Sequence, residues 1–168
     1  MIFEVVSAPP PAGLDKFFMY LKFMLLRTRT TTLMRQKLLE TNKKYFNYYA
    51  ASFANLLLAR PFFVRMARVA DYYAVKNSAF APYFETYKPD IVFCANLFNE
   101  TEIHLLREAK KWGVKTIGLI NSWDRTTTRC VLRLLPDKLI CFSEIIKSEL
   151  VRHDAIAPEN VYVGGIPH

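Results

Sequence analysis

Residues 88–120 read KPDIVFCANLFNETEIHLLREAKKWGVKTIGLI, and this stretch decides the fold class. Its first apolar run, residues 90–95, is short and rich in strand-forming side chains, which favours a strand. Asn99 then stands where a helix N-cap is expected, with Glu102 three residues later to complete a capping box, and apolar residues keep helical spacing beyond it. A second apolar run follows at residues 114–120. The stretch therefore predicts a strand, a helix and a second strand.

The same unit repeats toward the end of the chain. Two further strands are predicted at residues 138–142 and 160–163, with a helix over residues 143–153 between them. The predicted strands begin 22 to 24 residues apart, the length of a strand with its crossover helix, so they should be parallel. Because residues 138–142 are mostly apolar rather than alternating, we expect helices on both faces of the sheet. With residues 2–6 as a further strand, the expected fold class is α/β, a Rossmann-like parallel sheet of about five strands.

The first half of the chain differs from the second in charge and in aromatic content. Residues 1–89 carry 13 basic and 5 acidic side chains and 18 of the 24 aromatic residues, whereas residues 90–168 carry 10 side chains of each charge. This change of composition divides the chain into a strand plus a basic, aromatic helical segment at 1–87 and a βαβ-repeat portion at 88–168.

Three apolar stripes at helical spacing run through the first half, and Pro61 separates the second from the third. We expect these stripes to pack into the core. Their members are Phe17, Leu21, Met24 and Leu25; Phe46, Tyr49, Ala50, Phe53 and Leu57; and Phe62, Met66, Val69 and Tyr73.

A second group of aromatic residues lies off these stripes, among lysines and arginines. Basic and aromatic side chains together suit an anionic membrane surface or a lipid-linked substrate, and no helix resembles a nucleic-acid reader. We therefore expect a membrane or lipid partner and no nucleic acid. The group comprises Phe18, Phe23, Tyr45, Tyr48 and Tyr72.

Several functional classes are excluded by motifs that the sequence lacks. Its five glycines allow neither a G-x-G-x-x-G dinucleotide fingerprint nor a P-loop, and its three cysteines and three histidines show no metal-ligand spacing. We therefore expect no cofactor and no metal site. An odd number of cysteines without a secretory signal indicates a reducing compartment, so the expected location is cytoplasmic, with peripheral attachment to the inner face of the cell membrane if the first half binds lipid.

The candidate site lies beyond the carboxyl ends of the predicted strands, where ligands bind in open parallel sheets. Asp124 is the candidate catalytic residue, because a carboxylate in a loop beside an indole can have its pKa raised by desolvation and can accept a proton from a substrate hydroxyl. The alternative is that Asp124 pairs with Arg125 or Arg129 and shapes the loop. The candidate substrate-binding residues are Asn96, Asn99, Asn121, Ser122, Trp123, Arg125, Ser143, Gly165 and His168.

Several short motifs in the second half resemble one enzyme family. They are KPDIVF at 88–93, LLREAKKWGVKT at 105–116, NSWD at 121–124, PDKLI at 136–140 and VGGIP at 163–167. Together they resemble the N-terminal domain of GT-B glycosyltransferases, in particular the bacterial surface-polysaccharide and glycerophosphotransferase-like members. The resemblance implies half of a GT-B fold that binds a lipid-linked or saccharide acceptor. A nucleotide-binding domain, absent from this chain, would hold a sugar-nucleotide or CDP-glycerol donor.

Three functions are compatible with these observations. The leading one is the acceptor-binding half of an inverting glycosyltransferase or glycerophosphotransferase in surface polysaccharide or glycolipid synthesis, with Asp124 as general base. The first alternative is a non-catalytic α/β module that binds a membrane or a partner protein. The second is half of a sugar-nucleotide 2-epimerase, because the G-x-P ending near residue 165 also occurs in those enzymes of the same fold.

Overall fold

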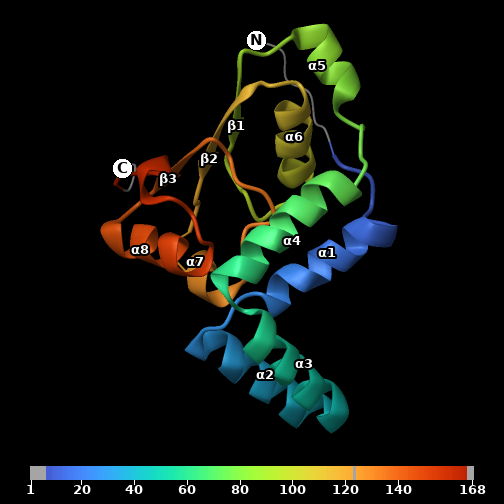
Figure 1. Cartoon of the computed structure of the whole chain (residues 1–168), viewed down its shortest axis with the longest axis vertical. Coiled ribbons are helices and arrows are strands. Elements are labelled where there is room, and N and C mark those ends of the chain that lie inside the picture. Colours follow the sequence, from blue (N-terminus) through green and yellow to red (C-terminus); the bar gives the residue numbers. More distant parts are fainter. Residues whose placement is uncertain (1–6, 123, 166–168) are drawn as a thin grey trace.

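The structure is a computed structural model that describes residues 7–122 and 124–165. Helices fill the first half, and strands alternate with helices in the second (Figure 1). The first half comprises α1 (Gly13–Met24), α2 (Arg29–Asn42), α3 (Tyr45–Leu58), α4 (Pro61–Ala74) and α5 (Ala81–Tyr87). The second half comprises β1 (Ile91–Cys94), α6 (Glu100–Lys111), β2 (Lys115–Leu119), α7 (Arg125–Thr128), β3 (Lys138–Cys141), α8 (Glu144–His153), a 3₁₀ turn (Pro158–Asn160) and β4 (Val161–Val163).

The four strands of the described chain form one parallel sheet in the order β1-β2-β3-β4. Neighbouring strands pair in register, as Val92 does with Thr116 and Leu119 with Ile140. The four strands predicted from the second half are confirmed, each to within one residue at either end. Residues 2–6 lie outside the described residues, so the fifth strand stays a prediction.

Helices cover one face of this sheet. When strand order follows the chain and each crossover is right-handed, the crossover helices all lie on the same side. Val92, Leu139 and Val161 point to that side and share a buried core with Leu106 of α6 and Leu150 of α8. The close approach of the loop after β1 explains why β2 carries a glycine, since a Cβ at position 118 would lie 2.6 Å from a side-chain methyl carbon of residue 97.

The opposite face of the sheet carries apolar side chains that stay exposed within the described chain. Phe93 is 56% exposed and Tyr162 is 53% exposed, with Ile117 and Ile140 half-buried between them. The expectation of helices on both faces is therefore wrong for the described residues. Residues 138–142 are apolar because one row of side chains fills the core and the other lies on this open face.

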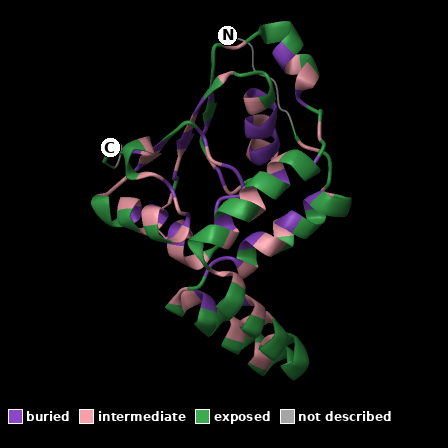
Figure 2. Cartoon of the chain, in the orientation of Figure 1, coloured by how far each residue is buried: buried purple, intermediate pink, exposed green. Residues whose placement is uncertain are grey.

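Two of the three apolar stripes in the first half face solvent (Figure 2). On α3, Phe46 is 84% exposed and Phe53 is 63% exposed; on α4, Phe62 and Tyr73 are 69% and 73% exposed. The expected core packing is wrong for both stripes. The cause on α4 is that its inward face carries Asp71, a polar residue that is 2% exposed and fully engaged by buried arginines.

The α1 stripe and the aromatic residues that lie off the stripes also divide into buried and exposed side chains. The α1 stripe is partly buried, since Leu25 is in the core while Phe17 is 55% exposed. Of the aromatic residues expected to contact lipid, Phe18 is buried and Tyr72 packs against the sheet core. Tyr45 remains exposed at the start of α3. Periodicity therefore identified the apolar faces of these helices but not the direction in which each face points.

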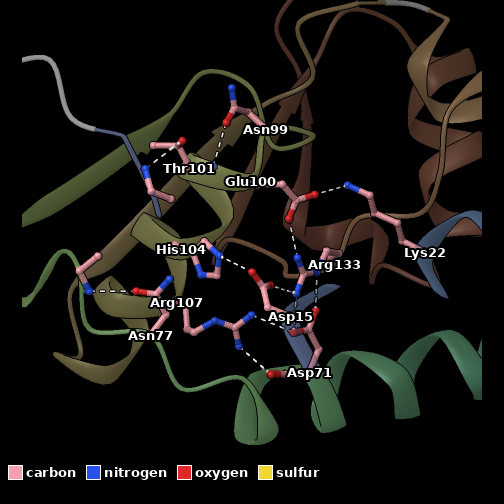
Figure 3. A network of polar contacts seen from close by, with 12 residues as sticks. Asp15, Lys22, Asp71, Asn77, Asn99, Glu100, Thr101, His104, Arg107 and Arg133 are labelled. Carbon is pink, nitrogen blue, oxygen red and sulfur yellow. Dashed lines mark hydrogen bonds and ion pairs between the residues drawn. The ribbon is translucent and has the colours of Figure 1, made fainter. Parts of the chain in front are cut away.

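A buried ionic network joins the helices of the first half to the second half (Figure 3). Arg133 donates to both carboxylate oxygens of Asp71, at 2.8 and 2.9 Å, and to Asp15 at 2.8 Å. Arg107 is fully buried and donates to Asp71 at 2.8 Å. The proposed boundary at residues 87 and 88 is therefore crossed by charge pairs in a shared interior.

The network is completed on α1 and at the start of α6. Glu100 accepts hydrogen bonds from Lys22 and Arg133, and His104 lies 3.1 Å from a carboxylate oxygen of Asp15. Burial is the main reason that the pKa of His104 lies below its ordinary value, so this imidazole is neutral at pH 7. Three carboxylates then face three cations, and the charges of the network balance. The six are Asp15, Asp71, Glu100, Lys22, Arg107 and Arg133.

Candidate functional site

The carboxyl ends of the strands meet at one edge because the sheet is parallel. The predicted loops after each strand therefore emerge together, as the sequence indicated. Trp123 and His168, two of the predicted substrate-binding residues, lie outside the described residues. The described candidates that open these loops are Asn96, Asn121, Ser143 and Gly165.

Two of the candidate residues serve as helix N-caps. The Asn99 side chain accepts a hydrogen bond at 2.8 Å from the backbone N–H two residues on, at the start of α6. Ser143 accepts one at 3.3 Å from the backbone N–H three residues on, at the start of α8. The expected capping box of α6 is wrong, because Glu102 accepts from the backbone N–H of Asn96 at 2.7 Å instead. These hydrogen bonds stabilise the starts of the two helices, so the side-chain oxygens of Asn99 and Ser143 have a structural role as helix caps.

The partner of Arg125 is the loop after β1, not the neighbouring residue Asp124. Its guanidinium donates to the side-chain oxygen of Asn96 at 3.0 Å and lies 5.7 Å from the ring centroid of Phe98. This contact ties together the loops that follow β1 and β2. Instead of the predicted hydrogen-bonded pair with Asp124, Arg125 therefore joins two neighbouring loops at the carboxyl edge of the sheet.

Asp124 is held by its own loop. The Ser122 hydroxyl donates a hydrogen bond to the Asp124 carboxylate, and this bond is the main reason that the pKa of Asp124 lies below its ordinary value. The positive charges of Arg125 and Arg129 lower the pKa further. The expectation that desolvation raises this pKa is therefore wrong, and the carboxylate is ionised at neutral pH.

A cavity of about 770 Å³ opens beside Asp124, between the end of α1, the α2–α3 hairpin and α7. This volume lies in the range of about 300–1,000 Å³ that is usual for small-molecule sites. Its wall is mostly apolar and carries a few charged groups. The apolar residues that matter here are Phe23, Met34, Leu38 and Tyr48, and the charged ones are Arg35, Lys44, Asp124 and Arg129.

Polar contacts fix the hairpin that forms one wall of the cavity. Asn55 of α3 is buried and donates to two backbone carbonyls at the end of α1, at 2.6 and 2.9 Å. Arg35 of α2 donates to the Asn55 side-chain oxygen at 2.9 Å. The Thr28 hydroxyl, at the N-cap of α2, donates to the carbonyl of Thr127 at 2.7 Å. The hairpin is thereby attached both to α1 and to the loop that carries Asp124.

The charged groups of the cavity differ in how they are engaged. Asp124 is bonded to Ser122, whereas the side chains of Lys44 and Arg129 make no hydrogen bond or ion pair with another residue in the described ranges. Three cations and one carboxylate therefore line an apolar cavity, and of the cations only Arg35 is already hydrogen-bonded, to Asn55, within the described ranges. This arrangement suits an amphipathic ligand whose apolar part contacts the wall and whose head group carries hydroxyl and anionic groups.

Asp124 could be identified from the sequence, but the helices α2 and α3 that form the cavity wall beside it could not. Met34 and Leu38 of α2 show no pattern that relates them to residue 124, because the contact between α2 and α7 is non-local. One signal did exist. Phe23 and Tyr48 were expected to contact lipid because they lie off the apolar stripes, and both line this cavity.

Comparison of the chain with protein-family models, with curated proteins and with solved structures finds no match.

Proposed function

We propose that the chain is the acceptor-binding half of a glycosyltransferase or glycerophosphotransferase that acts on a lipid-linked saccharide in surface polysaccharide or glycolipid synthesis. A second domain would bind the sugar-nucleotide or CDP-glycerol donor. Asp124 is the general base, and the cavity beside it binds the acceptor. The short motifs that resemble the acceptor domain of GT-B enzymes support the proposal from the sequence.

The observation that carries the proposal is the position of Asp124 on the wall of an amphipathic cavity. A lipid-linked saccharide has an apolar chain, an anionic phosphate linkage and free hydroxyl groups. Phe23, Met34 and Leu38 supply apolar wall for the chain, and Lys44 and Arg129 supply charge for the phosphate. Asp124 can then accept a hydrogen bond from a sugar hydroxyl.

The transfer step needs one proton acceptor on this half. The acceptor hydroxyl oxygen attacks the donor at the anomeric carbon, or at phosphorus for glycerophosphate, while its proton passes to Asp124. The bond from that centre to the nucleotide breaks, and the leaving phosphate takes the electron pair. An ionised carboxylate of low pKa is a weak base toward a free alcohol, but the hydroxyl becomes more acidic as the new bond forms.

A non-catalytic α/β binding module is the second candidate. It is favoured by the hydrogen bond from Ser122, which engages the Asp124 carboxylate within its own loop. Such a module would bind an amphipathic molecule in the same cavity without any proton transfer. The two candidates therefore differ in the effect of Asp124 on turnover and agree on binding.

Binding is tested by calorimetric titration of the chain with farnesyl-diphosphate-linked N-acetylglucosamine. We expect saturable binding with one site, and a loss of at least about tenfold in affinity for Met34→Glu, because the bound lipid chain would cover a charge on the cavity wall. Leu14→Glu is the matched control, since Leu14 is 55% exposed on α1 and outside the cavity. Absence of saturable binding, or equal affinity for the two variants, would exclude this cavity as the acceptor site.

A further inference from the structure

The outer face of α3 is the most apolar exposed helix surface among the described residues of the first half. It comprises Tyr45, Phe46, Tyr49, Phe53, Leu56 and Leu57, each between 45% and 84% exposed. The spacing from Phe46 through Tyr49 and Phe53 to Leu57 places these side chains along one side of the helix. The inward side is fixed by Asn55, so the apolar side cannot turn toward the core.

Charge surrounds this face but does not interrupt it. The 14 residues of α3 include no acidic or basic side chain. Lys43 and Lys44 stand immediately before the helix, and Arg60 stands two residues after its end; all three are exposed. The α2–α3 hairpin projects from the body of the molecule, so this apolar and basic surface lies at an extremity (Figure 1).

The dimensions of α3 restrict what can cover it. A helix of 14 residues is about 21 Å long, which is shorter than the roughly 30 Å of a bilayer core. Among the described residues no helix is both long enough and apolar enough to cross a membrane. An aromatic helix face of this length with cations at both ends matches a helix that lies in the plane of a membrane surface.

We propose that the outer face of α3 docks on the surface of an anionic phospholipid bilayer, with Lys43 and Lys44 against the head groups. The charge complementarity favours this occupant over a second copy of the chain, because a second copy would bring the same lysines and the same net charge of +8 to the contact. The inference deepens the proposed function, because the hairpin that would contact lipid also forms the wall of the cavity in which a lipid-linked acceptor would bind.

Co-sedimentation with vesicles tests the proposal without any transfer reaction. Vesicles of phosphatidylcholine alone are compared with vesicles that also contain phosphatidylglycerol. We expect stronger binding to the anionic vesicles and a loss of about 25-fold for the double variant Lys43→Asn with Lys44→Gln, at about fivefold for each lysine near the surface. Lys76→Gln, an exposed lysine beyond α4, is the matched control.

The apolar part of the surface has its own test. Phe46→Ser with Phe53→Ser should lower binding to anionic vesicles by at least tenfold, because two aromatic rings no longer enter the interface. Ile145→Ser is the control, since Ile145 is 71% exposed on α8. Binding that raised salt weakens but does not abolish fits a surface that combines charge with apolar contact.

Two outcomes would overturn the proposal. One is equal, weak sedimentation with neutral and anionic vesicles at low salt. The other is a concentration-dependent dimer in analytical ultracentrifugation that the Phe46 and Phe53 substitutions abolish, since α3 would then be a contact between copies. Asp124→Asn should leave vesicle binding unchanged, so failure of membrane docking and failure of the transferase proposal give different results.

Discussion

Asp124→Asn in the transferase that contains this chain should lower the rate of transfer by about 10² to 10⁴. Asparagine keeps the size of the side chain and can still accept the Ser122 hydrogen bond, but it cannot take the proton of the acceptor hydroxyl. The measurement is transfer of labelled sugar or glycerophosphate from the nucleotide donor to a lipid-linked acceptor. Glu159→Gln, which changes an exposed carboxylate outside the site, is the control and should be near wild type.

The pH dependence adds a second readout for Asp124. Because its pKa lies below the ordinary aspartate value, the carboxylate is available as a base throughout the neutral range. Its contribution to the rate is present above that lowered pKa and is lost only as pH falls through it, so the rate should not fall across the neutral range on account of this group. Wild-type turnover in the Asn variant would leave the cavity as a binding site and favour the non-catalytic module.

Asp71→Ala should lower the free energy of unfolding by about 3–5 kcal/mol, a large part of the stability of a typical domain. The substitution removes the carboxylate that accepts hydrogen bonds from Arg107 and Arg133, and both guanidinium groups remain buried. Arg107 then has no carboxylate partner among the described residues, while Arg133 keeps Asp15 and Glu100. A buried cation without its partner keeps its desolvation cost and loses the compensating interaction. The measurement is urea unfolding followed by circular dichroism.

Two further substitutions identify the cause of that loss. Asp71→Asn retains an oxygen acceptor and should cost less than alanine. Asp90→Ala removes an exposed carboxylate and should change the free energy of unfolding by less than about 0.5 kcal/mol. An Asp71→Ala variant within 1 kcal/mol of wild type would show that the network in Figure 3 does not hold the two halves together.

The strands and crossover helices of the second half could be predicted because their signals are local. Residues 88–120 contain an apolar run, a helix cap and a second apolar run in the right order, and each of these follows from neighbouring residues. Coverage of the sheet could not be predicted in the same way. It depends on strand order, and a consecutive order places all crossover helices on one side.

The helices of the first half show what periodicity leaves open. The stripe on α3 was identified correctly, yet Phe46 and Phe53 face solvent. Which face of α3 turns inward is decided by Asn55, and which face of α4 turns inward is decided by Asp71. The hydrogen-bond partners of these two residues lie 29 to 62 residues away in the sequence. A polar residue among apolar neighbours gives no local indication that its partners lie in another part of the chain.

In the candidate site too, features set by neighbouring residues could be predicted, and contacts between residues far apart in the sequence could not. The loop from residue 121 to 129 could be placed at the sheet edge because it follows a predicted strand. The hydrogen bond from Ser122 was not foreseen, and it reverses the expected pKa shift of Asp124. The cavity wall from α2 and α3 comes from helices about 70 residues or more away along the chain, which no spacing rule connects to Asp124.

The central claim is that the cavity beside Asp124 binds an amphipathic acceptor. The most direct measurement is photo-crosslinking of the chain with farnesyl-diphosphate-linked N-acetylglucosamine that carries a photoreactive group on the lipid, followed by mass spectrometry of the crosslinked peptides. We predict crosslinks at Phe23, Met34 or Tyr48, and their loss when unlabelled probe competes. Crosslinks confined to the open sheet face at Phe93 and Tyr162, or unaffected by competitor, would contradict the claim.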